Sequence, residues 1–283
     1  PMTTARYARQ TRLPGFGPAQ QEQLAKVRIL AVGAGGLGAV FLPVLAGAGV
    51  GHITIVDPDT IDISNLHRQT IYTTDQIGQP KAASAAAYLK ALNPDVNVAA
   101  FHQKIEGFEG NGPYDLILDG TDNFAAKSFI NEWALAHATP LIAASVNGFE
   151  GQCGIFAGHD ADAPCYRCLF PDLPDEAPNC ATAGILGSVP GIAGQYQAHL
   201  ALLYLTGLGD MAPGTFLQFD FMGLRSTRLR VPKTPRCPCC AGKTQPQPTR
   251  HRATEQPELL AYEALPPGCI IVDVREAEEL EYD

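Results

Sequence analysis

The sequence predicts an α/β fold with a doubly wound, mainly parallel Rossmann-like sheet that is extended by antiparallel strands. Three observations predict it. Apolar runs typical of strands alternate with helix-like runs through roughly the first 150 residues, which is the pattern of a parallel sheet. A glycine-rich turn, GAGGLG, joins the first expected strand to the first expected helix. Residues 214–231 alternate apolar and polar side chains, as antiparallel strands do.

The first half of the chain contains the elements of the parallel sheet. Strands are expected within residues 27–32, 51–57, 96–105, 114–123 and 140–146. Helices are expected within residues 37–48, 79–94 and 124–138. The first of these helices contains Pro43, which should bend it or cost it a hydrogen bond, and the alanine-rich second helix should end before Pro94.

The second half should add a strand, a loop, a long helix and the antiparallel strands. These are expected within residues 149–158, 165–180, 184–205 and 214–231. Residues 1–242 then form one domain, and residues 243–257, which are polar and rich in proline, form a linker. Residues 258–283 restart a strand and an acidic helix but are too few to fold alone, which predicts the incomplete start of another domain.

Composition excludes several classes of protein. A chain of 283 residues with 46% hydrophobic and 17% charged residues is ordinary for a globular protein. A formal net charge of −9 argues against nucleic-acid binding. Residues 31–56 carry no charged side chain, but glycines and a proline interrupt them, so no membrane span is expected. The N-terminal residues lack the pattern of a signal peptide, which predicts a cytoplasmic protein with reduced cysteines.

The glycine-rich turn and the strand after it predict a nucleotide site. Gly33, Gly35 and Gly36 would let the backbone approach a phosphate, and the following helix offers free N–H groups. Asp57 ends the next strand, where a carboxylate can accept hydrogen bonds from ribose hydroxyls. The plainer interpretation is close packing of the helix on the strand without a ligand.

Charged residues after this second strand favour a triphosphate over a dinucleotide. Arg68 and Lys81 could neutralise phosphate charge during phosphoryl or adenylyl transfer. Asp119 and Asp122 follow a buried strand and could hold magnesium against phosphate oxygens. Simpler explanations are open for each: the cations as solvated surface groups, and Asp119 as the cap of a turn.

The eight cysteines include two C-x-x-C pairs. Their members are Cys165 with Cys168 and Cys237 with Cys240. Two such pairs can close a tetrahedral zinc site, although they lie farther apart in sequence than those of a zinc finger. A redox role is the alternative, but we expect neither pair to open a helix after a strand, as a thioredoxin-like motif does. Cys239 is left over, and Cys153 and Cys269 are expected to be buried apolar residues.

Six motifs, taken together, resemble those of the ThiF/MoeB/HesA superfamily of adenylating enzymes, which are related to ubiquitin-activating enzymes. In chain order they are RYARQ, GAGGLG, DPDTIDISNLHRQ, GQPK, DGTDN and CYRCLFP, and the resemblance covers about residues 5–242. It implies a homodimer that uses Mg²⁺ and ATP to adenylate the C-terminal glycine of a ubiquitin-like sulfur-carrier protein ending in Gly-Gly. Pyrophosphate is released, and the carrier is prepared for thiocarboxylate formation.

The resemblance also implies roles for individual residues. Asp122 should hold magnesium, with Asn123 beside it, and Arg9 should reach across the dimer into the partner's site. The implied nucleotide-binding set is Gly33, Gly35, Gly36, Asp57, Ser64, Asn65, Leu66, His67, Arg68, Lys81, Asp122 and Asn123. The implied catalytic set is Asp122, Arg68, Lys81, Arg9 and Cys180.

Three further implications concern sulfur chemistry and zinc. The family uses its two C-x-x-C pairs for a structural zinc ion. Cys180, in a loop outside both pairs, resembles the cysteine that joins covalently to the activated carrier; a merely exposed or packed thiol is the alternative. CIIVDVREAEELEYD resembles the start of a rhodanese-like domain, so a persulfide would come from elsewhere.

Two other functions stay open, namely an NAD-dependent oxidoreductase and a non-catalytic subunit of a heterodimeric activating enzyme. The oxidoreductase would need a nicotinamide pocket, and the non-catalytic subunit would lack the arginine or aspartate of the site, which this chain has. Molybdopterin, thiamine and other sulfur pathways share these motifs, so the carrier is not specified.

Overall fold

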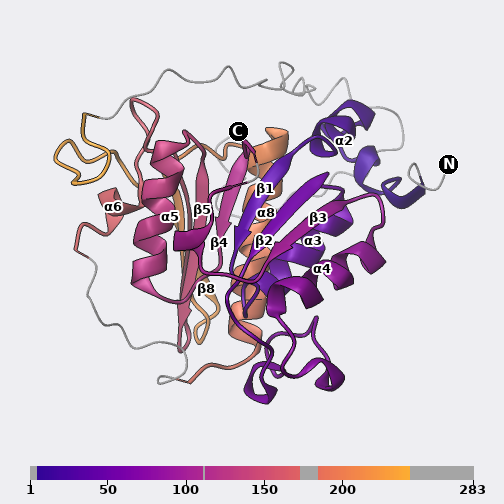
Figure 1. The fold of residues 1–283 in the computed structure, drawn as a ribbon. Helices are drawn as coiled ribbons and strands as arrows, with labels where there is room; N and C mark the ends of the chain where they lie inside the picture. Colours follow the sequence, from indigo (N-terminus) through magenta and orange to yellow (C-terminus); the bar gives the residue numbers. More distant parts are fainter. Residues whose placement is uncertain (1–4, 111, 173–183, 243–283) are drawn as a thin grey trace. The chain divides into compact units, whose positions relative to one another are not determined.

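A computed structural model describes residues 5–110, 112–172 and 184–242 (Figure 1). Its centre is an eight-stranded sheet with the order β3-β2-β1-β4-β5-β6-β7-β8. The strands are β1 (Arg28–Val32), β2 (His52–Val56), β3 (Asn97–Phe101), β4 (Leu116–Asp119), β5 (Leu141–Asn147), β6 (Glu150–Phe156), β7 (Thr215–Asp220) and β8 (Arg225–Arg230).

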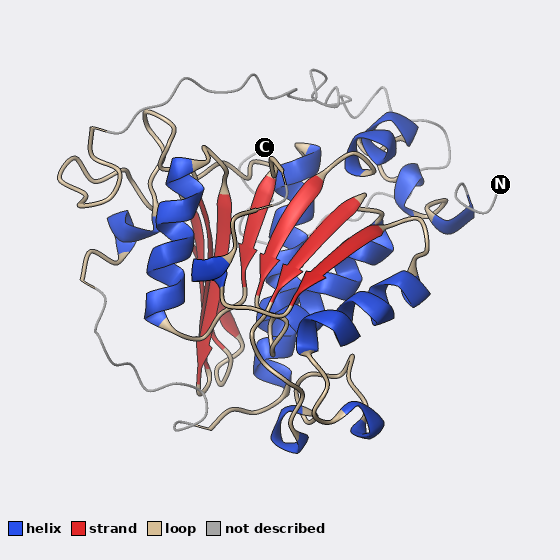
Figure 2. Cartoon of the chain, viewed as in Figure 1, coloured by secondary structure: helices blue, strands red, loops and turns tan. Residues whose placement is uncertain are grey.

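Helices connect the strands and cover both faces of the sheet (Figure 2). The α-helices are α2 (Pro18–Leu24), α3 (Gly38–Ala48), α4 (Lys81–Leu92), α5 (Phe124–Ala136), α6 (Tyr166–Leu169) and α8 (Ser188–Thr206). Short 3₁₀ helices are η1 (Gln10–Arg12), η2 (Ile63–Asn65), η3 (Thr74–Gln76) and η4 (Ile105–Gly107). Pro43 lies inside α3, as expected.

The two halves of the sheet differ as predicted. Strands β3, β2, β1, β4 and β5 run parallel to their neighbours, whereas β5–β6, β6–β7 and β7–β8 pair antiparallel. The chain reverses its direction of winding between β1 and β4. Ligands of open α/β sheets bind at the carboxyl ends of the strands on either side of such a switch point. The predicted doubly wound sheet with its antiparallel extension is therefore confirmed.

Alternate residues of the parallel strands enter two separate cores. Ile29 and Ala31 of β1 belong to the core that also contains residues of α3, α4 and α8. Leu30 and Val32 face the other way, into a core that includes Ala126, Ile130 and Ala134 of α5. Because side chains of a strand alternate between its faces, a strand buried on both sides is apolar throughout, which is how these strands could be found in the sequence.

One feature differs from the expectations: the segment expected as a loop from residue 165 opens with the single helical turn α6. The N-terminal residues, for which no element was predicted, form η1 and α2. Such short elements depend on local capping and on packing more than on periodicity. In the described part of the chain, no helix combines the length and the apolar character that crossing a bilayer requires. The proposed domain boundaries at 243 and 258 lie outside the described residues.

Candidate functional site

A pocket of about 940 Å³ opens at the carboxyl ends of β1, β2, β4 and β5. Nine of the twelve residues predicted to bind the nucleotide line it: Gly33, Gly35, Gly36, Asp57, Asn65, Arg68, Lys81, Asp122 and Asn123. Additional polar lining residues are Asp59, Gln69, Lys104, Glu106, Thr121, Lys127, Ser145, Asn147, Glu150, Gln152 and Gln218. The structure therefore brings most of the predicted site together in one cavity at the topological switch point.

The glycine loop has a backbone that only glycine tolerates at two points. Gly33 has φ +92°, in the left-handed region, and a Cβ there would lie 3.0 Å from the backbone of Gly120. A Cβ on Gly38 would lie 2.2 Å from the carbonyl oxygen of Gly33. The loop and the start of α3 thus pack closely against the end of β4, as the glycine spacing predicts.

Asp57 links the end of β2 to the glycine loop. One carboxylate oxygen, Oδ2, accepts the N–H of Ala34 at 2.7 Å, and Oδ1 accepts the N–H of Asp59 at 2.8 Å. Burial raises the pKa of this carboxyl; the two backbone bonds and nearby Lys81 lower it without cancelling the effect of burial. Each oxygen can still accept a further hydrogen bond, as a ribose hydroxyl would require.

Lys81 is held in place by bonds within the chain. Its Nζ lies 2.9 Å from Oδ2 of Asp59, and its backbone N–H donates to the carbonyl of Asp59 at 3.0 Å. The hydroxyl of Tyr72 donates to the carbonyl of Ala34 at 2.8 Å and reaches that of Lys81 at 3.3 Å. These bonds connect the glycine loop with the beginning of α4, and so join the two parts of the expected phosphate site.

Arg68 is oriented by two residues that were predicted to bind nucleotide themselves. Its Nη1 donates to the carbonyl of Ser64 at 2.9 Å and lies 2.8 Å from Nε2 of His67. Its Cδ lies near Gly36 on the pocket wall. Ser64, Leu66 and His67 do not line the pocket, and Leu66 packs against the core. In this structure Ser64 and His67 support the cation, and their direct contact with nucleotide stays a prediction.

The acidic residues of DGTDN are used differently. Asp119 forms a buried ion pair with Lys127 on α5, Nζ to Oδ2 2.9 Å, and accepts the N–H and hydroxyl of Thr121. Asp122 is exposed and lines the pocket, while Asn123 caps α5 by accepting the N–H of Ala126 at 2.8 Å. Asp119 is thus committed to the turn, in line with its simpler explanation, and Asp122 is the acid available to a ligand.

Arg9 and Cys180 are the remaining members of the predicted catalytic set. Arg9 is exposed, directly before η1, and is not among the residues that line the pocket of its own chain. Its predicted role in the partner's site is left as a prediction. Cys180 lies outside the described residues, as does Cys269.

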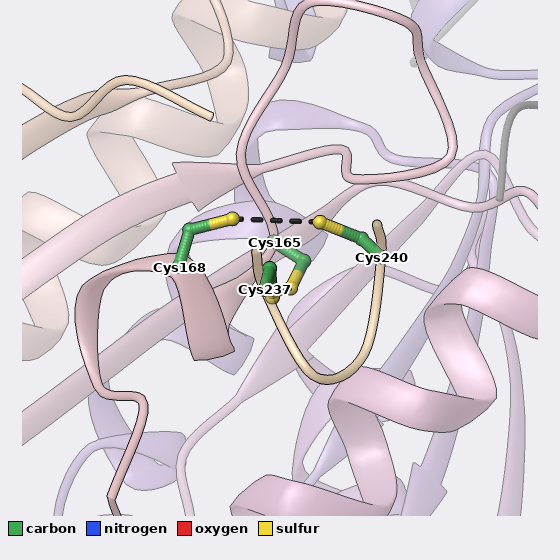
Figure 3. Close-up of side chains that lie close together, drawn as sticks. All are labelled: Cys165, Cys168, Cys237 and Cys240. Carbon is green, nitrogen blue, oxygen red and sulfur yellow. Dashed lines mark hydrogen bonds between the residues drawn. The ribbon is translucent and has the colours of Figure 1, made fainter. Parts of the chain in front are cut away.

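The two C-x-x-C pairs meet in space, as predicted (Figure 3). The Sγ atoms of Cys165, Cys168, Cys237 and Cys240 all lie within 4.8 Å of one another. Sγ–Sγ distances are 3.5 Å for Cys165–Cys237 and 3.4 Å for Cys168–Cys240. Zinc–sulfur bonds of about 2.3 Å in a tetrahedron place sulfurs about 3.8 Å apart, so these thiols fit a zinc ion.

The environment of the cluster favours one thiolate. Burial opposes ionisation of Cys237, but the N–H groups of Cys240 and Cys239 and the thiol of Cys165 outweigh it and lower the pKa of Cys237 to about 7. Burial raises the pKa of Cys165, and it raises that of Cys240 to about 12. Metal ions bind cysteine as the thiolate, so a zinc ion here would take the place of the thiol protons.

The first C-x-x-C opens a single helical turn, with Cys165 as the N-cap residue of α6. That turn is four residues long and does not directly follow a strand, because β6 ends at Phe156, so this pair lacks the strand-to-helix setting of a thioredoxin-like motif, as expected. It places Cys165 and Cys168 one turn apart, with the N–H of Cys168 donating to the carbonyl of Cys165 at 3.0 Å. Cys153 is buried, as predicted.

Sequence reasoning missed several residues of the pocket. Asp59 and Lys127 each form an ion pair inside the site. Their partners are Lys81 and Asp119, which lie 22 and 8 residues away in the sequence. Lys104 lines the pocket from the segment after β3. Gln152 and Gln218 face each other across β6 and β7. The sequence showed the alternating apolar and polar side chains of these two strands, but it did not show which face of the strands would line the pocket.

Comparisons with known proteins agree with this geometry. A sequence model of the ThiF family matches residues 7–239. The sulfur carrier protein adenylyltransferase of Thermus thermophilus is 40% identical over 267 residues, covering 92% of this chain and 95% of that protein. The molybdopterin-synthase adenylyltransferase of Escherichia coli is 36% identical over 238 residues, covering 83% of this chain and 95% of that protein.

A solved structure extends the similarity to the fold. The crystal structure of Escherichia coli MccB has a TM-score of 0.74 at 18% identity and covers 88% of this chain and 76% of its own. At that identity the likeness concerns the architecture alone. With a family match over most of its length, full-length relatives at 36–40% identity and the expected pocket at the switch point, the chain belongs to the ThiF family.

Proposed function

We propose that this protein is an adenylyltransferase that uses ATP to activate the C-terminal glycine of a ubiquitin-like sulfur-carrier protein ending in Gly-Gly. The observation that carries the proposal is the convergence of the glycine loop, Asp57, the two fixed cations Arg68 and Lys81, and the exposed Asp122 in one pocket. The names of the full-length relatives support adenylation of a sulfur carrier over the oxidoreductase alternative.

The chemistry follows from what the pocket can stabilise. A carboxylate oxygen of the carrier's last glycine attacks the α-phosphorus of ATP, and the bond from that phosphorus to the oxygen leading to the β-phosphate breaks. Pyrophosphate leaves with the bonding electrons, and the carrier retains the AMP as an acyl-adenylate. Negative charge gathers on the phosphate oxygens, so fixed cations at Arg68 and Lys81 lower the barrier.

Asp122 is the residue that we assign to magnesium. Among the acids of DGTDN, Asp122 lines the pocket and Asp119 does not. Carboxylate oxygens are suitable ligands for magnesium, which usually keeps several waters and substrate phosphates as its other ligands. When bound with ATP, the ion would supply further neutralisation of phosphate charge, and Asp122 would hold it. In the same way, the four thiols of the cluster would hold a structural zinc ion.

Room for the carrier's tail lies on the antiparallel side of the pocket. Glu150, Gln152 and Gln218 line the cavity from β6 and β7, beyond the parallel strands. Their side chains offer hydrogen-bond partners to an extended peptide backbone. This part of the pocket would admit the Gly-Gly end toward the α-phosphate.

The remaining parts of the proposal rest on the family resemblance. A homodimer would bring Arg9 to the partner's site, and Cys180 would join the activated carrier. Sulfur would come from a separate persulfide donor, in a cytoplasmic setting.

The test is ATP–pyrophosphate exchange with a panel of purified sulfur-carrier proteins. We expect exchange with at least one carrier and a loss of roughly 10²–10³-fold in Asp122→Asn, because a group acting on transition-state charge is removed. Asp95→Asn is the matched control, since Asp95 is exposed and away from the pocket. Absence of exchange with every carrier, or equal rates in the two variants, would contradict the proposal.

A further inference from the structure

A buried ion pair anchors both ends of the loop that carries Asp122. The Nζ of Lys127 donates to Oδ2 of Asp119 at 2.9 Å and to the carbonyl of Ala144 at 2.8 Å. The side chains of Lys127 and Asp119 are 2% and 1% exposed. Because Asp119 ends β4, Lys127 lies near the start of α5 and Ala144 belongs to β5, the pair fixes three elements around one point.

Asp119 also sets the backbone inside the loop. Its Oδ1 accepts the N–H of Thr121 at 2.9 Å and the hydroxyl of Thr121 at 2.6 Å. Its carbonyl accepts Nε2 of Gln197 on α8 at 2.8 Å, and the same nitrogen lies 3.1 Å from the carbonyl of Ile142. Both carboxylate oxygens of Asp119 are therefore used to shape the turn from which Asp122 reaches the pocket.

Stability alone does not explain why charges are buried at this place. Taking an ion pair out of water is costly, and apolar side chains of similar size often stabilise a protein as well or better. What the pair supplies is a fixed geometry, because the Nζ of Lys127 also donates to the carbonyl of Ala144 and the other carboxylate oxygen of Asp119 accepts from Thr121. The ion pair lies at the two ends of the turn that carries Asp122, so this fixed geometry can determine where Asp122 lies in the pocket.

We propose that Lys127 and Asp119 are positioning residues, which hold Asp122 where it can bind the magnesium ion of ATP. The inference rests on the proposed adenylation. Neither residue is assigned to the reacting atoms: Asp119 does not line the pocket, and Lys127 does, but its Nζ is bonded to Asp119 and to the carbonyl of Ala144. Both act only through the placement of Asp122.

A double-mutant cycle on pyrophosphate exchange tests this action directly. Lys127→Met should lower the exchange rate by about 10–100-fold, as loss of a residue supporting a metal ligand does, and Lys127→Arg should restore most of it. In the Asp122→Asn background, Lys127→Met should have less than about a threefold effect, because coupled residues are non-additive. Lys90→Met, an exposed lysine on α4, is the control. Independent, multiplicative losses in the cycle would overturn the proposal.

A second measurement does not need the reaction. Titration calorimetry with ATP in EDTA and with ATP in Mg²⁺ gives the gain in affinity that magnesium provides. We expect a gain in the wild type, none in Asp122→Asn, and a strongly reduced one in Lys127→Met, with affinity in EDTA unchanged. A full gain in Lys127→Met, or no gain in the wild type, overturns the inference. A gain without exchange on any carrier contradicts only the adenylation of such carriers.

Thr121→Val covers the case in which Lys127→Met does not fold, since that substitution leaves a buried carboxylate unpaired. The valine removes one hydroxyl bond to Asp119 and keeps the ion pair. It should reduce the magnesium-dependent gain in the same direction by a smaller factor, about two- to tenfold, since one hydrogen bond is lost. An unchanged gain in a folded Thr121→Val protein counts against the proposal.

Discussion

The nucleotide pocket and the cysteine cluster are organised by different means. In the pocket, the two cations predicted to contact phosphate have partners within the chain: Lys81 has Asp59, and Arg68 has the carbonyl of Ser64 and the ring of His67. In the cluster, four thiols face one another without an opposing charge among them. Groups that repel one another when ionised need a cation to be held together. The pocket is therefore preorganised by the protein, whereas the cluster would be completed by an ion.

This contrast has consequences for where substitutions should act. The cluster joins the segment around α6 to residues 237–240, which are far apart in sequence, so its loss should be felt as a loss of stability. The pocket residues Arg68 and Asp122 are at least partly exposed, so replacing them should lower the rate of the reaction and change the free energy of unfolding little. Measuring both quantities for each variant can confirm or break the distinction.

The largest effect is expected from breaking the cluster. Cys165→Ser should abolish stoichiometric zinc and lower the free energy of unfolding by at least about 3 kcal/mol, because losing a structural metal is among the most destabilising single changes. Zinc content by mass spectrometry and urea unfolding measure the two effects. Cys153→Ala, a buried cysteine outside the cluster, is the control and should keep its zinc. The contrast breaks down if Cys165→Ser keeps its zinc or is no less stable than this control.

A smaller effect, and of the opposite kind, is expected from the pocket cation. Arg68→Ala should reduce pyrophosphate exchange by about 10²-fold, because positive charge at the developing anion is lost. Its unfolding free energy should change by less than about 1 kcal/mol, as for most partly exposed residues without a buried partner. Exchange kinetics and urea unfolding on the same samples give both numbers.

His67→Ala sharpens this prediction. It removes one hydrogen-bond partner of Arg68 and keeps the cation, so exchange should fall only by about two- to tenfold. Arg6→Ala is the control for both variants, since Arg6 also donates to a backbone carbonyl, that of Leu92, but lies away from the pocket. If His67→Ala were as damaging as Arg68→Ala, the histidine would have a role beyond orienting the guanidinium.

The parts that sequence predicted share a physical basis. Gly33 and Asp57 were found because their roles depend on local backbone geometry, which the order strand, turn, helix, strand already encodes. The cysteine pairs were found because thiols are rare and their spacing is distinctive. The apolar strands were found because burial on both faces leaves an unbroken apolar run.

The parts that were missed depend on tertiary placement. Asp59 and Lys127 look like surface charges in the sequence, and only the fold places them beside Lys81 and Asp119. His67 was predicted to bind nucleotide within the same motif as Arg68, but the sequence did not show that its ring lies beside the guanidinium of Arg68, a contact that the chain after η2 brings about. A motif identifies which residues gather at a site, but it does not divide them into those that bind and those that support.

The smallest predicted effect concerns Asp57, whose ionisation works against folding. Burial raises its pKa above 3.8, although the N–H groups of Ala34 and Asp59 and the charge of Lys81 oppose the rise. The folded chain therefore keeps a proton on Asp57 at pH values where the unfolded chain has lost it. Stability from this group is present below pH 3.8 and is lost as the pH rises through the raised pKa.

Asp57→Asn removes this pH dependence. The unfolding free energy of the wild type minus that of the variant should fall as the pH rises between about pH 4 and pH 7, and urea unfolding at several pH values measures it. A difference that is flat or rises with pH would show that the backbone bonds and Lys81 compensate fully for burial. Asp57, like Lys81, would then have its charge compensated by groups of the chain. The pocket would differ even more from the cluster, whose thiols have no opposing charge among them.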